Sequence, residues 1–143
     1  CLDMESLQVK DITLEAFKRL RSNKRFRDYP HLGIALQSYL RETDDDLEDL
    51  LTWARANALP ISIRLVKGAY WDYDTVLAKQ RGRPARLYTH KAETDCAFER
   101  LATRILENAD ICHLACASHN IRSIATVMEA AESAGGHTIH NAR

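Results

Sequence analysis

A length of 143 residues suits one domain of ordinary size, and a hydrophobic content of 45% is enough for a real core. Twenty basic and twenty acidic side chains cancel, so the composition carries no signature for binding nucleic acid or an anionic membrane. The chain has no apolar run of about 20 residues that would span a bilayer, and its four cysteines follow no secreted-domain spacing, which predicts a cytoplasmic location.

Short apolar runs alternate with helix-like patterns along the chain. Strand-like runs occur at 1–4, 31–39, 61–66 and 111–118. Helical periodicity occurs at 13–22, 43–58, 72–81, 92–108 and 121–134. This alternation predicts a parallel sheet with covering helices.

Several helix boundaries carry local signals. Thr43 is the expected N-cap of the second helix, and the three aspartates that follow it suit the positive end of the helix dipole. Gly82 and Pro84 should end the third helix, and Gly135 and Gly136 the last one. The apolar side chains expected to face the core from these helices are Leu14, Phe17, Leu20, Leu47, Leu50, Leu51, Ala54, Phe98, Leu101, Ile105, Leu106, Ile121, Ile124, Met128 and Ala131.

The strand patterns distinguish a small doubly wound domain from part of a barrel. In 61–66 every second residue is bulky and apolar, and the residues between them are Ser62, Arg64 and Val66. The other two long strands likewise have one apolar face and one face of mostly small residues that ends in a polar group. A doubly wound sheet is expected to be apolar on both faces. We therefore predict the α/β class, as a partial (βα)8 barrel with about four of its βα units.

Polar side chains stand where strands give way to loops. In a βα barrel these strand ends converge on one mouth, where the chemistry is done. An arginine in an apolar strand is costly to bury unless an anion or an acceptor meets it. Such a set can orient a polar heterocycle and balance its negative charge, and since no GxGxxG or Walker loop is present, side chains and helix N-termini would hold any phosphate. The strand-end residues are Asp3, Gln37, Arg64, Lys67, His119 and Asn120.

Each of these residues also has a structural interpretation, and the sequence leaves the alternatives open. Arg64 can pair with an acid inside the barrel, Lys67 can be a solvated loop residue, and Gln37 can be a satisfied core amide. His119 can cap the next helix, and from its spacing alone Asp3 is best explained as a surface acid. The two aromatic residues after the 61–66 strand can be simple packing. The occurrence of polar groups at four consecutive strand ends favours a site.

Two histidine patterns suggest metal ligands only weakly. Cys112-His113-xx-Cys116 lies inside a strand, so the cysteines share one face while the histidine points the other way, which is poor geometry for one tetrahedral ion. His137-xx-His140 lies in a terminal tail. We therefore expect no metal site.

The run RLVKGAYWD at 64–72 resembles the signature of the proline dehydrogenase family, which includes the catalytic domain of bifunctional proline utilization A enzymes. The resemblance covers nearly the whole chain up to Gly135, and the variants THK and SHN look like one bacterial branch of the bifunctional enzymes. Further segments that are similar in order and approximate spacing are LDME (2–5), GIALQSYLR (33–41), YTHKAETD (88–95) and ASHN (117–120).

The resemblance implies an FAD-dependent enzyme on a distorted (βα)8 barrel. In this family L-proline is oxidised to Δ1-pyrroline-5-carboxylate by hydride transfer to flavin N5. The reduced flavin passes its electrons to a quinone, which implies peripheral contact with the inner membrane. No nucleic-acid partner is implied, and no oligomeric state can be assigned from these patterns.

By position, the resemblance implies catalytic roles for Arg64, Asp3 and Tyr70, with Arg64 near flavin N5. Asp3, Ala69 and Tyr70 would form the proline pocket, in which Asp3 is better understood as a pocket-shaping or ion-pairing acid than as an obligatory base. The implied flavin contacts are Gln37, Arg64, Val66, Lys67, Gly68, Ala69, Trp71, Thr89, Lys91 and His119.

The implied flavin contacts divide along the ligand. Trp71 would pack against the adenine, and Thr89 and Lys91 would serve the adenosine and phosphate end. Residues 1–135 would then be the central part of the barrel, with 136–143 a tail open to disorder.

The resemblance also implies that parts of the family's site lie outside this sequence. An active-site lysine would precede Cys1, and the tyrosine and paired arginines that hold the proline carboxylate would follow Arg143. We therefore expect the chain to be a piece of a longer enzyme and to be inactive alone. A non-catalytic βα module or an incomplete gene product remains the alternative, and a different phosphate-binding barrel enzyme is less favoured.

Overall fold

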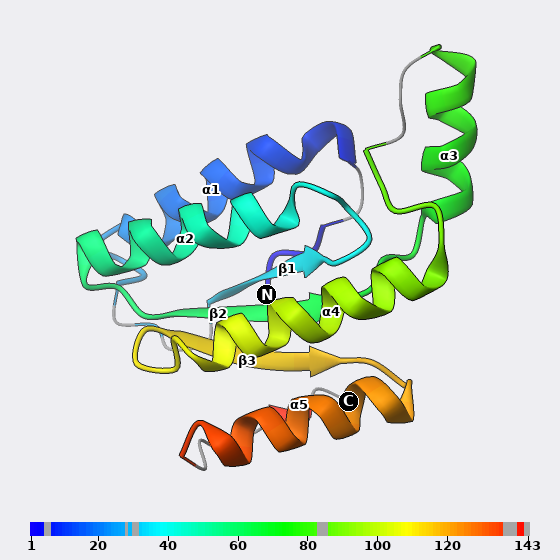
Figure 1. Ribbon diagram of the computed structural model, residues 1–143. Coiled ribbons are helices and arrows are strands. Elements are labelled where there is room, and N and C mark those ends of the chain that lie inside the picture. Colours follow the sequence, from blue (N-terminus) through cyan, green and yellow to red (C-terminus); the bar gives the residue numbers. More distant parts are fainter. Residues whose placement is uncertain (5–6, 28, 30–31, 83–85, 136–139, 142–143) are drawn as a thin grey trace.

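A parallel sheet forms the centre of the molecule (Figure 1). The computed structural model describes residues 1–4, 7–27, 29, 32–82, 86–135 and 140–141. Each strand pairs with the next one in the chain, and Leu2 adds a parallel bridge to Ile34. This sequential order is that of a barrel wall, whereas the strand order of a doubly wound sheet reverses. The strands are β1 (Gly33–Gln37), β2 (Ile61–Val66), β3 (Cys112–Ala117) and β4 (His140–Asn141).

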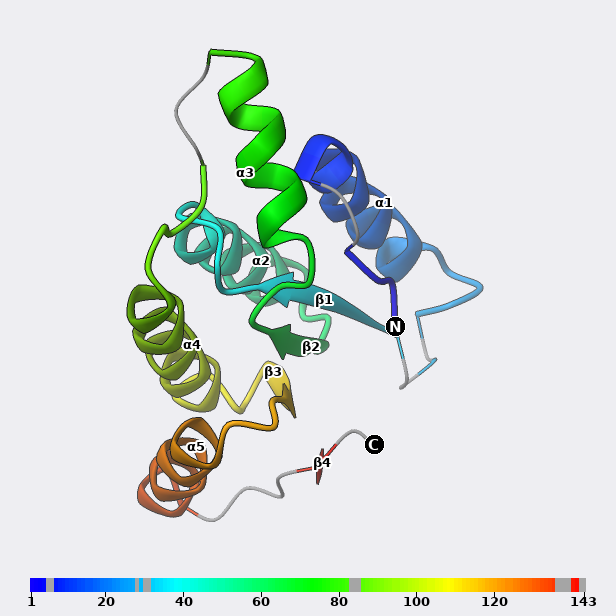
Figure 2. The same ribbon diagram turned by 90° about the vertical axis from the view of Figure 1, so that its right-hand side faces the viewer.

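Helices lie in an arc along one side of the sheet, as Figure 2 shows. The exception is α3, which stands apart at the carboxyl ends of the strands (Figure 1). Within the described residues, no helix is both long enough and apolar enough to cross a bilayer. The helices are η1 (Leu7–Val9), α1 (Lys10–Ser22), α2 (Thr43–Asn57), α3 (Trp71–Gln80), α4 (Lys91–Leu106) and α5 (Ile121–Ser133).

The main core lies between the outer face of the sheet and this helical layer. Ile61, Ile63 and Leu65 of β2 are buried, whereas the residues between them are half-buried. The residues of β3 alternate in the same way between the core and the inner face. This two-residue period confirms the predicted faces of β2 and β3, whereas all five residues of β1 are buried. The partial barrel is the observed architecture.

The strand register places small residues on both sides of Arg64. Arg64 pairs with Ala35 of β1 and with Ala115 of β3. Paired positions on neighbouring strands share a face, so only methyl groups flank the guanidinium on the inner face. One row below, a Cβ added at Gly33 would lie 2.8 Å from the carbonyl oxygen of Ser62, so the strands approach closely there. The inner face therefore has room beside the arginine for a ligand.

The predicted cap of α2 is wrong. Thr43 is the first residue of the helix, and Glu42 occupies the cap position without a side-chain capping bond. The Thr43 hydroxyl instead donates a hydrogen bond to the carbonyl of Gln37, at 2.6 Å. A hydroxyl at this position can bond either to the first backbone N–H groups of the helix or to a carbonyl at the strand end. Here it bonds to the carbonyl and links the start of α2 to the end of β1.

The predicted apolar stripes of α1 and α5 are partly wrong. Leu20, Ile121 and Met128 are exposed, with Ile121 at 84% of its full surface. The prediction selects the bulkiest apolar residues, whereas α5 turns a stripe of smaller side chains inward, next to α4. The buried residues of α5 are Ser123, Val127 and Ala131.

The other helix ends agree with the predicted signals. Gly82 follows α3 with φ +60° and Gly135 follows α5 with φ +96°, the left-handed conformations in which glycine ends helices. Pro84, Gly136 and His137 lie outside the described residues. Of the predicted tail, the structure describes only β4, which pairs with β3.

Candidate functional site at the strand ends

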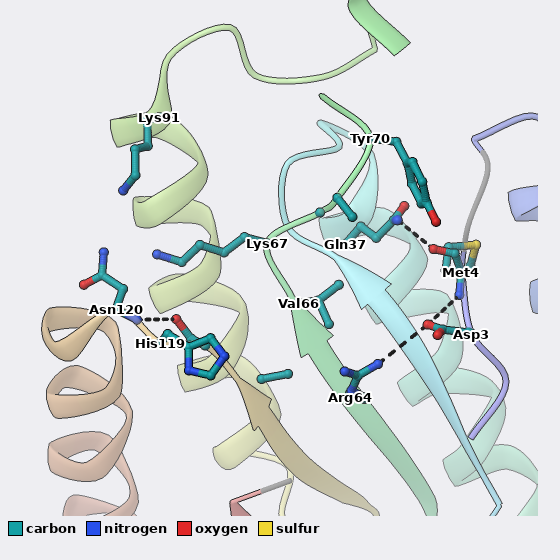
Figure 3. A pocket seen from close by; sticks show the side chains of 14 residues that line it. Asp3, Met4, Gln37, Arg64, Val66, Lys67, Tyr70, Lys91, His119 and Asn120 are labelled. Carbon is teal, nitrogen blue, oxygen red and sulfur yellow. Dashed lines mark hydrogen bonds and ion pairs between the residues drawn. The ribbon is translucent and has the colours of Figure 1, made fainter. Parts of the chain in front are cut away.

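A cavity of about 560 Å³ opens at the carboxyl ends of β1, β2 and β3 (Figure 3). We call it the mouth cavity. The parallel strands bring together side chains from the first residues of the chain to the start of α5. The predicted site residues that line it are Asp3, Gln37, Arg64, Val66, Lys67, Gly68, Ala69, Tyr70, Lys91 and His119.

Arg64 and Asp3 face each other across the mouth cavity (Figure 3). The distance from Arg64 Nη1 to Asp3 Oδ1 is 3.7 Å, and the two side chains are 42% and 64% exposed. An ion pair this long and this exposed contributes little to stability. Arg64 makes no other polar contact within the described residues, so its N–H groups remain able to bind a ligand.

Only one of the two polar groups of the Gln37 side chain has a hydrogen-bond partner within the described residues. Its side-chain nitrogen donates to the carbonyl of Met4 at 2.7 Å, while its Oε1 is buried and accepts no hydrogen bond within the described residues. A buried acceptor without a donor is costly, and such atoms are rare in folded proteins. An N–H group of a ligand in the mouth cavity would satisfy it, so the interpretation as a satisfied core amide does not hold.

Lys67 points toward α4 and α5 rather than into solvent. It donates hydrogen bonds to the Asp95 carboxylate and to Ser123 Oγ at 3.1 Å, and its Nζ lies 5.5 Å from the centre of the Phe98 ring. Burial alone would raise the pKa of Asp95, but hydrogen bonds from Lys67 and Lys91 hold it below its ordinary value. Sequence reasoning missed Asp95 and Ser123, although the spacing of four between Lys91 and Asp95 on a helix was a usable signal.

The start of α5 is capped by Asn120 and not by His119. The Asn120 Oδ1 accepts the backbone N–H groups of Arg122 at 3.0 Å and Ser123 at 3.4 Å. His119 is exposed and lines the mouth cavity. The capping alternative for His119 is therefore wrong, and its imidazole remains available at the cavity wall.

A second cavity of about 440 Å³, the rim cavity, adjoins the first. Trp71 is 39% exposed and its indole N–H donates to the Tyr88 carbonyl at 2.8 Å, which fixes the ring as one wall. Lys67, Gly68 and Lys91 line both cavities. The residues that line the rim cavity are Tyr39, Lys67, Gly68, Trp71, Thr89, Lys91, Thr94 and Asp95.

Gly68 lies where the two cavities adjoin and lines both of them. Gly68 has φ +128°, and a Cβ there would lie 2.2 Å from the Tyr39 ring. The Tyr39 hydroxyl donates to Asp74 Oδ2 at 2.7 Å, and both residues are buried. Burial and this hydrogen bond raise the pKa of Tyr39 well above its ordinary value. The Tyr39 ring, held by Asp74, therefore packs against the backbone of Gly68 and keeps it in place. Sequence reasoning identified neither Tyr39 nor Asp74.

The predicted cysteine pattern is arranged as the strand period requires. Cys112 and Cys116 are buried on the outer face of β3, while His113 lies on the inner face. Burial raises the pKa of the Cys112 thiol to about 12. Among the residues that the structure describes, no group of histidine, cysteine and acidic side chains is placed to hold a metal ion.

Comparisons with known proteins agree in the family they indicate. The profile of the family described as proline dehydrogenase matches residues 1–141. The bifunctional protein PutA of Klebsiella aerogenes is 26% identical over 131 residues, which are 91% of this chain and 10% of that protein. The proline dehydrogenase of Deinococcus radiodurans is 33% identical over 124 residues, or 87% of this chain and 33% of that protein. The chain thus spans a third or less of these relatives.

Solved structures show the same likeness. Proline utilization A from Bdellovibrio bacteriovorus, inactivated by N-propargylglycine, superposes with a TM-score of 0.89 at 45% identity, covering 92% of this chain and 14% of that one. Proline utilization A from Corynebacterium freiburgense gives a TM-score of 0.89 at 32% identity, covering 94% of this chain and 14% of that one.

Proposed function

The chain belongs to the proline dehydrogenase family, and we propose that it is the central part of an FAD-dependent enzyme that oxidises L-proline in proline catabolism. We call that longer protein the complete enzyme. The observation that carries the proposal is the pair of adjoining cavities that share Lys67, Gly68 and Lys91. FAD has a flavin at one end, an adenine at the other and a diphosphate between them, and the two cavities offer a matching sequence of environments.

The residues present fit such a ligand. The unpaired Oε1 of Gln37 can accept a flavin N–H, and the Arg64 guanidinium can donate to flavin nitrogen or oxygen. Gly68 lines both cavities, and since the Tyr39 ring fills the place that a side chain would take, only the backbone of Gly68 faces the ligand. The exposed Trp71 ring offers a face on which adenine can stack. Val66, Ala69 and His119 would complete the flavin contacts, and Thr89 the adenosine end.

Flavin bound in the mouth cavity would supply the redox chemistry by accepting a hydride at N5 from the Cδ of L-proline. Arg64 would stabilise the negative charge that develops there, because β2 holds its backbone between two alanines and its donors make only one long ion pair, with Asp3. Asp3 stands opposite Arg64 and would shape the substrate pocket together with Ala69 and Tyr70. As an exposed ion-pairing acid, Asp3 would orient groups rather than remove a proton.

Replacement of Arg64 tests the proposal directly. In the complete enzyme, Arg64→Met should slow flavin reduction by proline by a factor on the order of 100 to 1000, the effect of removing one preorganised donor. Arg55→Met is the matched control, because Arg55 of α2 pairs with Asp110 and Asn108 and lines neither cavity. The measurement is stopped-flow absorbance of the flavin with proline, and an unchanged rate in Arg64→Met would refute the role of Arg64.

The isolated chain should bind flavin weakly or not at all and should not reduce a dye with proline. The reason is that the resemblance places the other strands of the barrel, and the groups that hold the proline carboxylate, outside this sequence. Flavin absorbance and a proline-dependent dye assay on the purified chain test this. We also propose, from the family alone, a quinone as electron acceptor and peripheral contact with a membrane.

A further inference from the structure

One carboxylate holds two lysines at the border between the mouth cavity and the rim cavity. Asp95 Oδ1 accepts a hydrogen bond from Lys67, and Asp95 Oδ2 accepts one from Lys91 at 2.7 Å. Figure 3 shows both lysines on the same wall, Lys67 from the end of β2 and Lys91 from the start of α4. Both lysines line both cavities, whereas Asp95 lines only the rim cavity.

Each lysine keeps donors for a ligand. An ammonium group has three N–H donors. Lys67 uses one on Asp95 and one on Ser123, and Lys91 uses one on Asp95. The side chain of Lys91 is 78% exposed while that of Asp95 is only 16% exposed. The carboxylate is therefore a fixed point to which a flexible, exposed cation is attached.

The carboxylate changes the cost of binding an anion here. Two neighbouring ammonium groups repel each other, and each long lysine side chain loses rotamer freedom when a ligand immobilises it. A carboxylate between them offsets the repulsion and orders both side chains before the ligand arrives. Preorganisation of this kind raises affinity by removing part of the ordering cost.

We propose that Asp95 is a positioning residue that orients Lys67 and Lys91 toward the diphosphate of FAD. This inference rests on the proposed function, because the diphosphate is that of the proposed cofactor. Two effects have opposite signs. Removing the negative charge of Asp95 would by itself strengthen the attraction for a diphosphate, whereas removing its positioning effect would weaken binding. Positioning is the larger of the two, so loss of Asp95 weakens binding although the site becomes more positive.

The test is equilibrium binding of FAD and of riboflavin, which lacks both phosphates, to the flavin-free complete enzyme. Binding is followed by flavin fluorescence. Asp95→Asn should raise the dissociation constant for FAD about tenfold and change that for riboflavin by less than about twofold. Riboflavin reports whether the mouth cavity is intact. If the role of Asp95 were purely structural, Asp95→Asn would weaken the binding of both ligands alike.

A double-mutant cycle shows whether Asp95 acts through the lysines. In the Lys67→Gln/Lys91→Gln background, Asp95→Asn should no longer weaken FAD binding and should tighten it slightly, because both of its partners are gone and only the repulsion between its carboxylate and the diphosphate remains. Asp110→Asn is the matched control. Asp110 is an exposed carboxylate paired with Arg55 at the amino end of β3, and its replacement should leave both ligands unaffected.

The outcomes separate the inference from the proposed function. FAD binding that is unchanged or tighter in Asp95→Asn overturns the positioning role, as does an equal loss of FAD and riboflavin. If the wild-type enzyme binds no FAD, the proposed function fails and the inference with it. Should Asp95→Asn not fold, Asp95→Glu keeps the charge and moves the carboxylate by one methylene. That variant should bind FAD about threefold more weakly, and wild-type affinity in it overturns the role.

Discussion

The outer layer of the molecule and its rim are held by different kinds of contact. The outer layer consists of α2 and α4 with the outer faces of β2 and β3, and its contacts are mostly apolar. The rim consists of residues 67–74 and 87–95, which follow the strand ends and border the two cavities. The helix α2 buries four apolar residues of its sequence, whereas the only buried residue of α3 is Asp74.

This difference shows how the site is positioned. Burial of apolar area is strong but has no direction, so the outer layer fixes the strands without defining side-chain orientations at their ends. The rim depends on a few directional bonds, chiefly Tyr39 to Asp74, Trp71 to the Tyr88 carbonyl, and the lysines to Asp95. Such segments belong to the less stable part of a fold, where binding sites are commonly found. Mutations in the outer layer should therefore change global stability, whereas mutations in the rim should act locally.

The largest effect on stability is expected when a buried side chain of the outer layer is truncated. Leu50 of α2 is fully buried, so Leu50→Ala should lower the free energy of unfolding by about 2–5 kcal/mol through lost transfer energy and a cavity. Thr52→Ala, on the exposed side of the same helix, should stay within about 0.5 kcal/mol. Denaturant unfolding of the complete enzyme measures both, and a loss below about 1 kcal/mol for Leu50→Ala would contradict the comparison.

A smaller loss of stability, confined to the rim, is expected when Gly68 is replaced by alanine. Gly68→Ala combines the left-handed φ penalty of about 1–2 kcal/mol with overpacking against the Tyr39 ring. Gly82→Ala is the matched control, since Gly82 also has positive φ but its Cβ would meet nothing within 4 Å. Hydrogen exchange of the amides at 67–74 should accelerate in the first variant much more than in the second. Equal effects would mean that the Tyr39 contact is unimportant.

Loss of one hydroxyl should loosen α3 and spare α2. Tyr39→Phe removes the hydrogen bond to Asp74 and leaves that buried carboxylate with one donor fewer, at a cost of about 1–3 kcal/mol. Because α3 has no fully buried apolar residue to compensate, its amides should lose protection against hydrogen exchange. Tyr73→Phe, on the exposed face of α3, is the control and should change nothing. Unaltered protection of α3 in Tyr39→Phe would show that another contact holds the helix.

The same contrast explains what could be predicted from the sequence. The outer layer follows from periodicity, because Ile61, Ile63 and Leu65 alternate with polar or smaller residues, and every predicted helix is present with ends shifted by no more than about one turn. The exposed positions of Ile121 and Met128 could not be predicted, since periodicity ranks residues by hydrophobicity and cannot show which stripe meets a neighbouring helix.

The rim was predictable only in part. The strand-end residues follow from the geometry of a parallel sheet, and the resemblance named the segments around them. The partners of those residues, namely Asp95, Ser123 and Asp74, come from helices far away in the sequence. No local pattern records a contact such as Lys67 to Ser123, which only the packing of α4 and α5 onto the sheet creates.

The smallest effect expected is a dependence of rim stability on acid pH. Hydrogen bonds from Lys67 and Lys91 lower the pKa of Asp95 below its ordinary value of about 4, so these contacts stabilise the folded rim above about pH 4 and are lost as the pH falls through the lowered pKa. The difference in amide protection at 88–95 between wild type and Asp95→Asn should therefore correspond to about 1 kcal/mol or less near neutral pH and shrink below about pH 4. Asp110→Asn provides the control, because the lowered pKa of Asp110 arises from Arg55, outside the rim. A difference that persists undiminished at low pH would show that the ionised carboxylate is not what holds the two lysines.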